Sequence, residues 1–384
     1  MENIIDIKEL RKIIDELDEK MVGLFCDRMK VSYEVARYKK EKNMAVYDPA
    51  RERQLLCRIN EMAGEEFGEY ATTLYKTVME LSRTYQHHLL SPAPPIKNEI
   101  ESMLSTSPKM LPKYAKVACQ GVEGAYSQIA AVRMFDTPTI SYYGDFADIF
   151  SAVSTGECDY GVLPIENSTA GSVNRVYDLL KSNESLIVKS TRIKIDHNLL
   201  AKPGVKKSEI KEIFSHEQAI SQCAGYLKSL DGVKVTVCAN TAMAARAVSE
   251  SDREDVAALS SYSCAELYGL NVVESSVQDM QNNFTRFIVI SRQRQILPGA
   301  DRTSIMLKTQ HIPGALYQTL ARINAHGVNL IKLESRPIPE RNFEFMFYFD
   351  IEASIYDPGL SELLGELEEN SEDFRYLGSY SELV

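Results

Sequence analysis

The sequence predicts a multi-domain protein with three parts of different fold class: an all-α part, an α/β part and a small α+β part. Its length of 384 residues exceeds the size at which a single hydrophobic core keeps growing. Residues 89–113 contain five prolines, and they separate a wholly helical pattern from one in which short apolar runs alternate with helical patterns. A second break lies near residues 292–303. We therefore predict a helical domain at 1–90, a linker at 91–113, an α/β domain at 114–299 and an α+β domain at 302–384.

The composition argues against several classes of partner. Forty-three basic and fifty-four acidic residues give a net charge of −11, which disfavours nucleic acid and acidic membranes as partners. An anionic ligand would therefore need a local group of cations. The first twenty residues are dense in charge and no run approaches the length of a membrane span, so we expect no signal peptide and a cytoplasmic protein.

Cysteine and histidine spacings give no sign of a metal site. The seven cysteines include no CxxC pair and the six histidines no HxxxH pair. We expect neither a bound metal nor a disulfide framework, in a reducing compartment.

The first segment predicts three helices. Asp6 with Glu9 suggests a cap, followed by a helix of about 36 residues, or about 54 Å. Asp48 and Pro49 are typical of a second helix start, with that helix ending near residue 62. A third helix is predicted at about 65–89. The first helix is long for a globular domain, which suggests a coiled-coil-like or intertwined arrangement.

Polar residues interrupt the apolar faces of these helices. At about 100° per residue, Arg28 and Lys39 lie about 20° apart and share a face. Ser82 and Gln86 are four residues apart and also share a face. Most such residues are solvated surface charges, and spacing alone leaves that interpretation open.

Four stretches of this segment, "LRKIIDELD", "DRMKVSYEVARYK", "DPARERQLL" and "ELSRTYQ", resemble the all-helical chorismate mutase family over about 85 residues. The resemblance implies an intertwined dimer that binds chorismate. It implies that the substrate carboxylates are held by Arg11, Arg28 and Arg51, that Lys39 and Gln86 act catalytically at the ether oxygen, and that Asp48, Glu52 and Ser82 assist with the hydroxyl and with orientation. A helical domain kept only for dimerisation is the alternative.

The implied chemistry suits these residue types. Conversion of chorismate to prephenate is a pericyclic rearrangement that needs no nucleophile, base or cofactor. Holding the reactive conformer removes an entropic part of the barrier, and donors at the breaking ether bond stabilise developing charge. Planar guanidinium groups suit bidentate binding of carboxylates.

Four loops of the α/β segment share one design, in which a strand is followed by a short polar turn and a helix. Helix N-termini with free N–H groups favour anions. Neither GxxxxGK[ST] nor GxGxxG spacing is present, which disfavours nucleotide binding. His216 is either a base or a helix cap. The turns lie at residues 121–124, 166–171, 215–216 and 240–241.

The motifs "GAYSQIAA", "FADIFSAV", "YGVLPIENSTAGSV", "SHEQAISQC" and "NFTRFIVI" resemble the prephenate dehydratase family over roughly 180 residues. The resemblance implies two α/β lobes similar to periplasmic binding proteins, with crossovers near Thr191 and Gln281. It implies that Thr285 is the catalytic donor at the ring hydroxyl of prephenate and that Arg286 binds a carboxylate. It also implies cleft positions for Asn167, Ser168, Thr169, Ser215 and Gln218, and for Glu166 in either a catalytic or a structural role.

Two rival functions remain for this cleft. An arogenate dehydratase is one, because a single amino group separates the two substrates. A non-catalytic sensor that uses the cleft and the last domain is the other. A threonine and an arginine side by side at the cleft argue against the sensor.

The last segment predicts a β-α-β-β-α-β unit of the ferredoxin-like kind. Pro313 fits a first helical position and Gly327 a helix end. The "GAL" and "ESRP" stretches resemble the phenylalanine-binding form of the ACT regulatory domain, which implies feedback inhibition by L-phenylalanine at a subunit interface of a homodimer or higher oligomer. A small packing domain without a ligand is the alternative. The implied effector residues are Gly314, Ala315, Leu316, Asn329, Glu334, Ser335 and Arg336.

Overall fold

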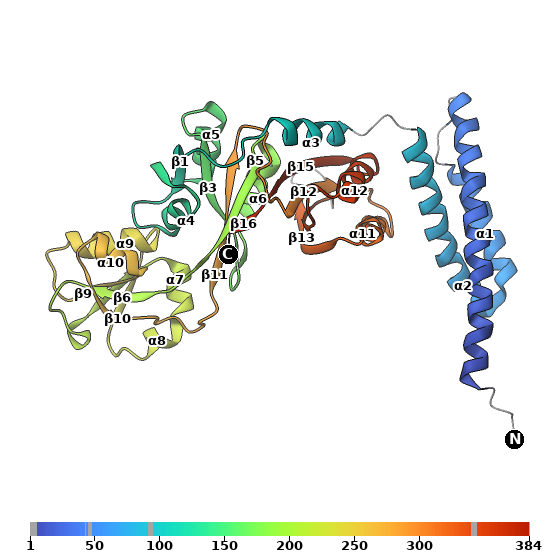
Figure 1. Ribbon diagram of the computed structural model, residues 1–384. Helices are drawn as coiled ribbons and strands as arrows, with labels where there is room; N and C mark the ends of the chain where they lie inside the picture. The colour runs from blue at the N-terminus through green and yellow to red at the C-terminus, as the bar shows by residue number, and fades with distance from the viewer. Residues whose placement is uncertain (1–5, 43, 45–47, 91–94, 339–343, 384) are drawn as a thin grey trace, which may run out of the picture. The chain divides into compact units, whose positions relative to one another are not determined.

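The computed structural model describes residues 6–42, 44, 48–90, 95–338 and 344–383 (Figure 1). The chain divides into two compact units, one of the N-terminal helices and one that includes residues 96–315 and 319–384. None of the helices in the described ranges combines the length and the hydrophobicity that crossing a bilayer requires.

The N-terminal unit consists of two long helices, α1 (Ile7–Glu41) and α2 (Pro49–Leu90). The Asp6 carboxylate caps α1 by accepting from the Lys8 N–H at 3.2 Å. At Gly64 the backbone φ of 72° interrupts α2, since only glycine adopts this conformation without strain. The helix starts predicted from Asp6 and from Asp48 with Pro49 are confirmed, and the predicted break between residues 62 and 65 coincides with Gly64.

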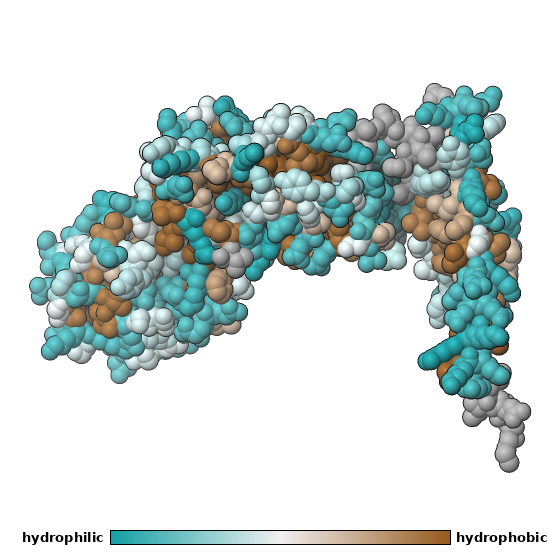
Figure 2. Space-filling model, in the orientation of Figure 1, coloured by the Kyte–Doolittle hydropathy of each residue, from teal (hydrophilic) through white to brown (hydrophobic). Residues whose placement is uncertain are grey.

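Helix α1 leaves most of its apolar side chains exposed. Within its described residues only Ser32 and Ala36 are buried. Ile14, Leu17, Met21 and Leu24 are each at least half exposed and recur at helical spacing. Figure 2 shows such hydrophobic residues gathered on the surface of the helical unit. A single copy of the chain therefore does not bury this face.

The predicted linker is not free of secondary structure. Residues Pro95–Thr106 form helix α3, with Ile96, Ile100 and Met103 buried. The Ile96 N–H donates to Glu368 at 3.0 Å, and Glu99 pairs with Arg294. The proline count concealed an apolar i, i+4, i+7 pattern, so this part of the prediction was wrong.

The second unit contains two α/β lobes. The first lobe is a sheet of order β16-β5-β11-β3-β1-β2, with β4 paired to β3. Its strands are β1 (Tyr114–Gln120), β2 (Thr137–Tyr143), β3 (Tyr160–Asn167), β4 (Gly171–Ser172), β5 (Leu186–Lys194), β11 (Phe284–Ser291) and β16 (Glu382–Leu383). Its helices are α4 (Tyr126–Met134), α5 (Phe146–Thr155) and α6 (Asn174–Ser182).

The second lobe is a sheet of order β10-β6-β9-β7-β8. The chain enters it after β5 and returns through β11, so the two predicted crossovers are confirmed to within a few residues. Its strands are β6 (Asn198–Ala201), β7 (Glu212–Ser215), β8 (Lys234–Val237), β9 (Val256–Ser260) and β10 (Asn271–Glu274). Its helices are η1 (Lys207–Glu209), α7 (Glu217–Gln222), α8 (Ala224–Lys228), α9 (Thr241–Glu250) and α10 (Tyr262–Leu267).

The C-terminal segment has the predicted β-α-β-β-α-β order, in an antiparallel sheet β13-β14-β12-β15. Helix α11 begins at Ala315 after Gly314, so Pro313 precedes the helix and is not its first residue as predicted. The elements are β12 (Arg302–Lys308), α11 (Ala315–Ala325), β13 (Asn329–Pro337), β14 (Phe345–Glu352), α12 (Pro358–Glu369) and β15 (Asp373–Tyr380).

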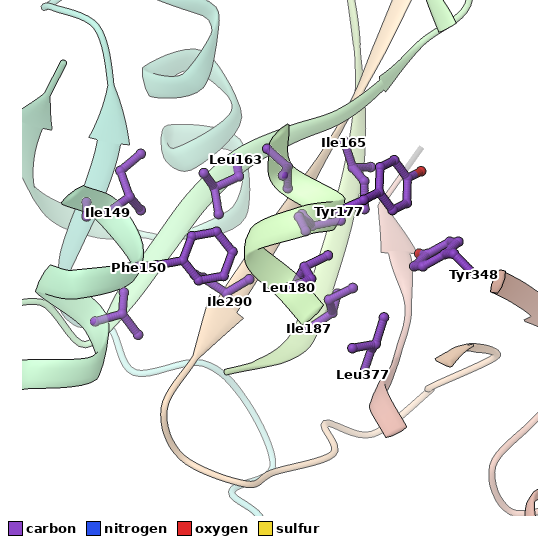
Figure 3. Close-up of a cluster of buried hydrophobic side chains, with 14 of the residues drawn as sticks. Ile149, Phe150, Leu163, Ile165, Tyr177, Leu180, Ile187, Ile290, Tyr348 and Leu377 are labelled. Atoms are coloured by element: carbon purple, nitrogen blue, oxygen red, sulfur yellow. The ribbon is translucent and has the colours of Figure 1, made fainter. Parts of the chain in front are cut away.

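The C-terminal segment shares a hydrophobic core with the first lobe. Figure 3 shows Tyr177 and Leu180 of α6 beside Tyr348 of β14 and Leu377 of β15. The rings of Tyr177 and Tyr348 meet edge to face with centroids 4.7 Å apart. Removing residues 302–384 would expose this core to water, so the function of the segment is better tested by point substitutions than by truncation.

Candidate active sites

A cavity of about 450 Å³ lies between the two α/β lobes of the second unit. Gln120, Asn167 and Thr285 line it from the first lobe, and His216 and Asn240 line it from the second. These residues stand where strands end and where helices α4, α7 and α9 begin, which is the usual ligand position in open α/β sheets.

The Thr285 hydroxyl is oriented by its neighbour across the sheet. Thr285 pairs with Asn167 between β11 and β3, and the Asn167 Nδ2 donates to Thr285 Oγ1 at 2.9 Å. No acceptor for the threonine proton lies within hydrogen-bond distance among the described residues. The hydroxyl therefore accepts from the protein and keeps its proton to donate into the cavity.

Asn167 is itself fixed on both sides of its amide. Its Oδ1 accepts from the N–H groups of Thr169 at 3.0 Å and Ala170 at 2.8 Å. Its Nδ2 also donates to Asn283 Oδ1 at 2.8 Å. These bonds assign the amide orientation, because a flipped amide would place its NH₂ against two N–H donors.

His197 joins this network and was not predicted from the sequence. Asn283 donates to Gln222 Oε1 at 3.0 Å, and His197 Nε2 lies 2.9 Å from the same oxygen. Since that oxygen only accepts, Nε2 must carry the proton and Nδ1 is bare. His197 follows a crossover, 88 residues from Thr285, so no local motif could have linked the two.

Burial lowers the pKa of His197 below its ordinary value of 6.5. The unfolded chain therefore takes up a proton at His197 at a higher pH than the folded chain does. We expect this residue to reduce the stability of the second unit as pH falls below 6.5, an effect absent at neutral pH. Thermal melts from pH 7.5 to 5 should show a shallower decline for His197→Gln than for the unaltered chain, and equal slopes would contradict the assignment.

Some of the remaining predicted cleft residues line the cavity, and others only hold the backbone that carries the lining. Gln218 lines the cavity, whereas Ser168, Thr169 and Ser215 do not, which corrects their predicted positions. Ser215 is fully buried and donates to Leu259 O at 2.9 Å. Ser168 Oγ donates to Asn282 O at 3.1 Å, and Thr169 Oγ1 donates to Asn167 Oδ1 at 2.7 Å. These three side chains hold the strand ends and turns that carry the wall.

His216 has a helix-capping contact. It lines the cavity, and its Nδ1 accepts from the Gln218 N–H at 3.3 Å at the start of α7. This contact favours the cap over the base among the two roles considered for it.

Arg286 and Glu166 lie on the opposite face of the sheet from Thr285 and Asn167. Side chains alternate along a strand, and Arg286 pairs with Glu166 one residue beyond the Thr285–Asn167 pair. Arg286 is 5% exposed and forms an ion pair with the buried Asp350 of β14. The structure therefore does not place Arg286 at a substrate carboxylate, which corrects that prediction, and gives Glu166 a position outside the cavity wall.

The cavity wall carries no cluster of cations. Among the described residues that line it, none is Lys or Arg. Positive potential comes instead from the N-termini of α4 and α9, with Asn240 capping α9 through the Met243 N–H at 2.8 Å. Gly121, in the turn after β1, has a φ of 98°, and a Cβ there would lie 3.3 Å from Ala125 Cβ. Because Gly121 has no Cβ, the backbone of this turn can lie close to the cavity.

In the helical unit, Arg28, Ser82 and Gln86 come together between α1 and α2. Arg28 donates to Ser82 Oγ, and Gln86 Nε2 donates to Ser82 O at 3.1 Å. Gln86 is 8% exposed, yet its Oε1 has no hydrogen-bond partner among the described residues. A buried amide with one open atom is a site for a ligand group.

The other predicted mutase residues are more widely spread. Lys39 is half-buried, and Glu52 pairs with Arg83. Asp48 Oδ1 accepts from the Arg51 N–H at 3.0 Å, while both side chains are exposed. Arg11 is exposed and makes no ion pair with any other described residue. One chain therefore gathers only part of the predicted set.

The predicted effector residues lie in two separate places on the C-terminal sheet. The register places Arg336 level with the end of β12 and Asn329 level with its start. Gly314 and residues 334–336 thus share one end of the sheet, whereas Asn329 lies about 23 Å from Arg336 along β13. Glu334 Oε2 accepts from Ser172 Oγ at 2.8 Å, and Arg336 pairs with Asp178 of α6 at 3.0 Å.

Comparison with known proteins finds two matching families. Residues 10–87 match the family described as chorismate mutase type II, and residues 117–295 match that described as prephenate dehydratase. The bifunctional chorismate mutase/prephenate dehydratase of Escherichia coli K12 is 34% identical over 97% of this chain and 95% of its own length. The chain belongs to this bifunctional family. It combines the rearrangement of chorismate to prephenate with the conversion of prephenate to phenylpyruvate, two steps of phenylalanine biosynthesis.

Two further relatives are informative about the substrate and about L-phenylalanine. An Arabidopsis thaliana arogenate dehydratase/prephenate dehydratase is 38% identical over 69% of this chain and 71% of its own length. The structure of an Arthrobacter aurescens prephenate dehydratase in complex with L-Phe is 29% identical, with a TM-score of 0.64, over 69% of this chain and 89% of that one.

The two family matches cover the two candidate sites of this bifunctional enzyme. The mutase match includes Arg28, Ser82 and Gln86, and the dehydratase match includes the cavity with Asn167 and Thr285. Both matches end before the C-terminal sheet.

Proposed function

We propose that prephenate binds in the cavity between the lobes and that Thr285 donates a hydrogen bond to its departing ring hydroxyl. The observation that carries this assignment is the Asn167–Thr285 bond, in which the threonine oxygen accepts and its proton has no acceptor among the described residues. Loss of hydroxide with carbon dioxide makes the ring aromatic, so the driving force is large. A fixed donor at the leaving oxygen and a fixed leaving carboxylate are what the step requires.

The carboxylates of prephenate would be held without a basic side chain on the wall. The N-termini of α4 and α9 direct backbone N–H groups toward the cavity, and the amides of Gln218 and Asn240 add neutral donors. Neutral donors bind the carboxylate that leaves as carbon dioxide less tightly than an arginine would, which favours its departure.

Chorismate would bind in the helical unit beside Arg28 and Lys39. Arg28 supplies a guanidinium for a carboxylate, and Lys39 with Gln86 supplies donors near the ether oxygen. Gln86 Nε2 carries two N–H groups, of which one donates to Ser82 O at 3.1 Å and the other would donate to the substrate. Arg51, Asp48, Glu52 and Ser82 complete the proposed set.

Each mutase site is proposed to be shared by two copies of the chain in a homodimer. Arg11 and Arg28 are 17 residues apart on α1, or about 25 Å along the axis, too far for one small substrate. The exposed stripe of Ile14, Leu17, Met21 and Leu24 supplies the apolar face that a second α1 would cover. Arg11 would then serve the site of the partner chain.

The C-terminal segment is proposed to be an ACT regulatory domain that binds L-phenylalanine. The L-Phe complex of the Arthrobacter aurescens relative supports this assignment. Gly314, the first residues of α11 (Ala315 and Leu316) and residues Glu334 to Arg336 lie at one end of the sheet, and the distant Asn329 would contribute from a second copy. The remaining proposals are the predicted domain boundaries, with residues 96–106 moved from the linker to the second unit, and a cytoplasmic location.

Arogenate is a second candidate substrate, because the Arabidopsis relative is named for both substrates. The described residues of the cavity wall include neutral amides and no acidic side chain that would select an ammonium group. Parallel assays with prephenate and arogenate separate the two, and a higher kcat/KM for arogenate would overturn the preference proposed here.

Incubation with chorismate is the direct test of the whole assignment. We expect prephenate to form and then to be consumed as phenylpyruvate accumulates, and L-phenylalanine to slow only the second phase by about 5–150-fold. The Gly314→Ala variant should need more L-phenylalanine for half inhibition, because its φ of 85° strains any residue with a Cβ. Unchanged inhibition by L-phenylalanine in this variant would place the effector site elsewhere.

A further inference from the structure

The strands that carry the catalytic hydroxyl are also the strands that the C-terminal sheet contacts. Across β3 and β11, Asn167 pairs with Thr285 on the cavity face, and Glu166 pairs with Arg286 on the other face. The two pairs are adjacent in sequence. A displacement of the second pair would therefore move the backbone of the first.

The first contact on this far face is a buried ion pair. Arg286 and Asp350 are 5% and 0% exposed, and Asp350 also accepts from the hydroxyls of Ser304 and Tyr348. A buried charge without its partner is strongly unfavourable, so this pair fixes β14 to β11 directly behind Thr285.

The second contact reaches the cavity wall itself. Lys332 of β13 donates to Glu166 Oε1 and to Ser172 Oγ, each at 2.8 Å. Ser172 lines the cavity and donates to Glu334 Oε2 at 2.8 Å. Glu334, a proposed effector residue, is thus one hydrogen bond from the wall of the dehydratase site.

We propose that Arg286 and Glu166 are positioning residues through which the C-terminal sheet sets the geometry of Thr285 and Asn167. The Arg286–Asp350 and Glu166–Lys332 pairs hold β11 and β3 from behind, and an effector that shifts β13 shifts Lys332, Glu334 and Ser172 with it. The inference rests on the proposed binding of L-phenylalanine to this segment. It adds the residues that connect that site to the cavity.

The first test uses Lys332→Met, which keeps most of the length of the side chain and removes its charge. The matched control is Arg375→Met, which removes another charged donor from the C-terminal sheet to the first lobe, the Arg375–Asn183 O hydrogen bond, outside the cavity wall. The measurements are the L-phenylalanine Kd by calorimetry, the maximal inhibition of the dehydratase, and its kcat and KM. The mutase rate is the internal standard for active protein.

We expect Lys332→Met still to bind L-phenylalanine. Its maximal inhibition by L-phenylalanine should be at least about fivefold weaker than that of the unaltered chain, since allosteric coupling commonly amounts to 5–150-fold. Arg375→Met should stay within about twofold of the unaltered chain. Full inhibition of Lys332→Met, or an equal loss in both variants, overturns the inference. Absence of L-phenylalanine binding to the unaltered chain overturns the proposed function, and the inference with it.

The second test addresses Arg286 by its conservative variant. Arg286→Met should lower the dehydratase kcat at least about tenfold with a smaller change in KM, and Arg286→Lys should recover part of that loss by keeping a charge opposite Asp350. A purely structural anchor would lower the fraction of folded enzyme but not kcat per folded site. If Arg286→Met does not fold, Arg286→Lys alone decides: unchanged kcat and unchanged inhibition together overturn the role.

Discussion

Thr285→Ala is expected to stop phenylpyruvate formation while chorismate is still converted to prephenate. The substitution removes the donor that Asn167 orients toward the cavity, and loss of one such donor commonly lowers kcat by about 10²–10³-fold. The mutase rate should not change, because its candidate residues lie in the separate helical unit. The experiment follows prephenate and phenylpyruvate in one reaction that starts from chorismate.

Thr285→Ser is the matched control for this prediction. It keeps a hydroxyl on the same Cβ and removes only a methyl group, so most of the dehydratase rate should remain. Asn167→Ala should lose less than Thr285→Ala, since the hydroxyl remains but is no longer oriented. A full dehydratase rate in Thr285→Ala would show that another group donates to the leaving oxygen.

Mutase activity is expected to reappear when two inactive variants, Arg11→Ala and Lys39→Ala, are unfolded and refolded together. Lys39→Ala removes a donor at the reacting oxygen, with an expected loss of about 10²–10³-fold. Arg11→Ala removes a charged hydrogen bond to a carboxylate of about 1.5–3 kcal/mol, or about 10–150-fold. In a mixed dimer one of the two sites holds both intact residues.

The size of the recovery is itself a prediction. Random pairing makes about half of the dimers mixed, and one of two sites in each is intact, so about a quarter of the normal mutase rate should return. Each variant refolded alone is the control. A fully active Arg11→Ala, or mixed dimers that remain inactive, would contradict a site shared between chains.

Local sequence signals determined the element boundaries well. Asp6 marks the start of α1, Asp48 with Pro49 marks the start of α2, and Asn240 caps α9, because caps act through hydrogen bonds within a few residues. The same signals predicted the strand–turn–helix loops that line the cavity, and Thr285 and Asn167 lie there as predicted. In residues 95–106 the proline count outweighed a short amphipathic pattern, so helix α3 was missed.

The roles that were wrong depend on contacts between distant segments. Arg286 stands beside Thr285 in the sequence, and strand alternation already places the two on opposite faces. Which face borders the cavity is decided by packing, since the partner of Arg286 is Asp350, 64 residues away in another sheet. His197 was missed for the same reason, because its link to Thr285 passes through Gln222, Asn283 and Asn167. The sequence by itself determined the elements and the residue types at their ends, whereas the tertiary structure decided which charge is paired inside the protein and which hydroxyl is left to donate to a substrate.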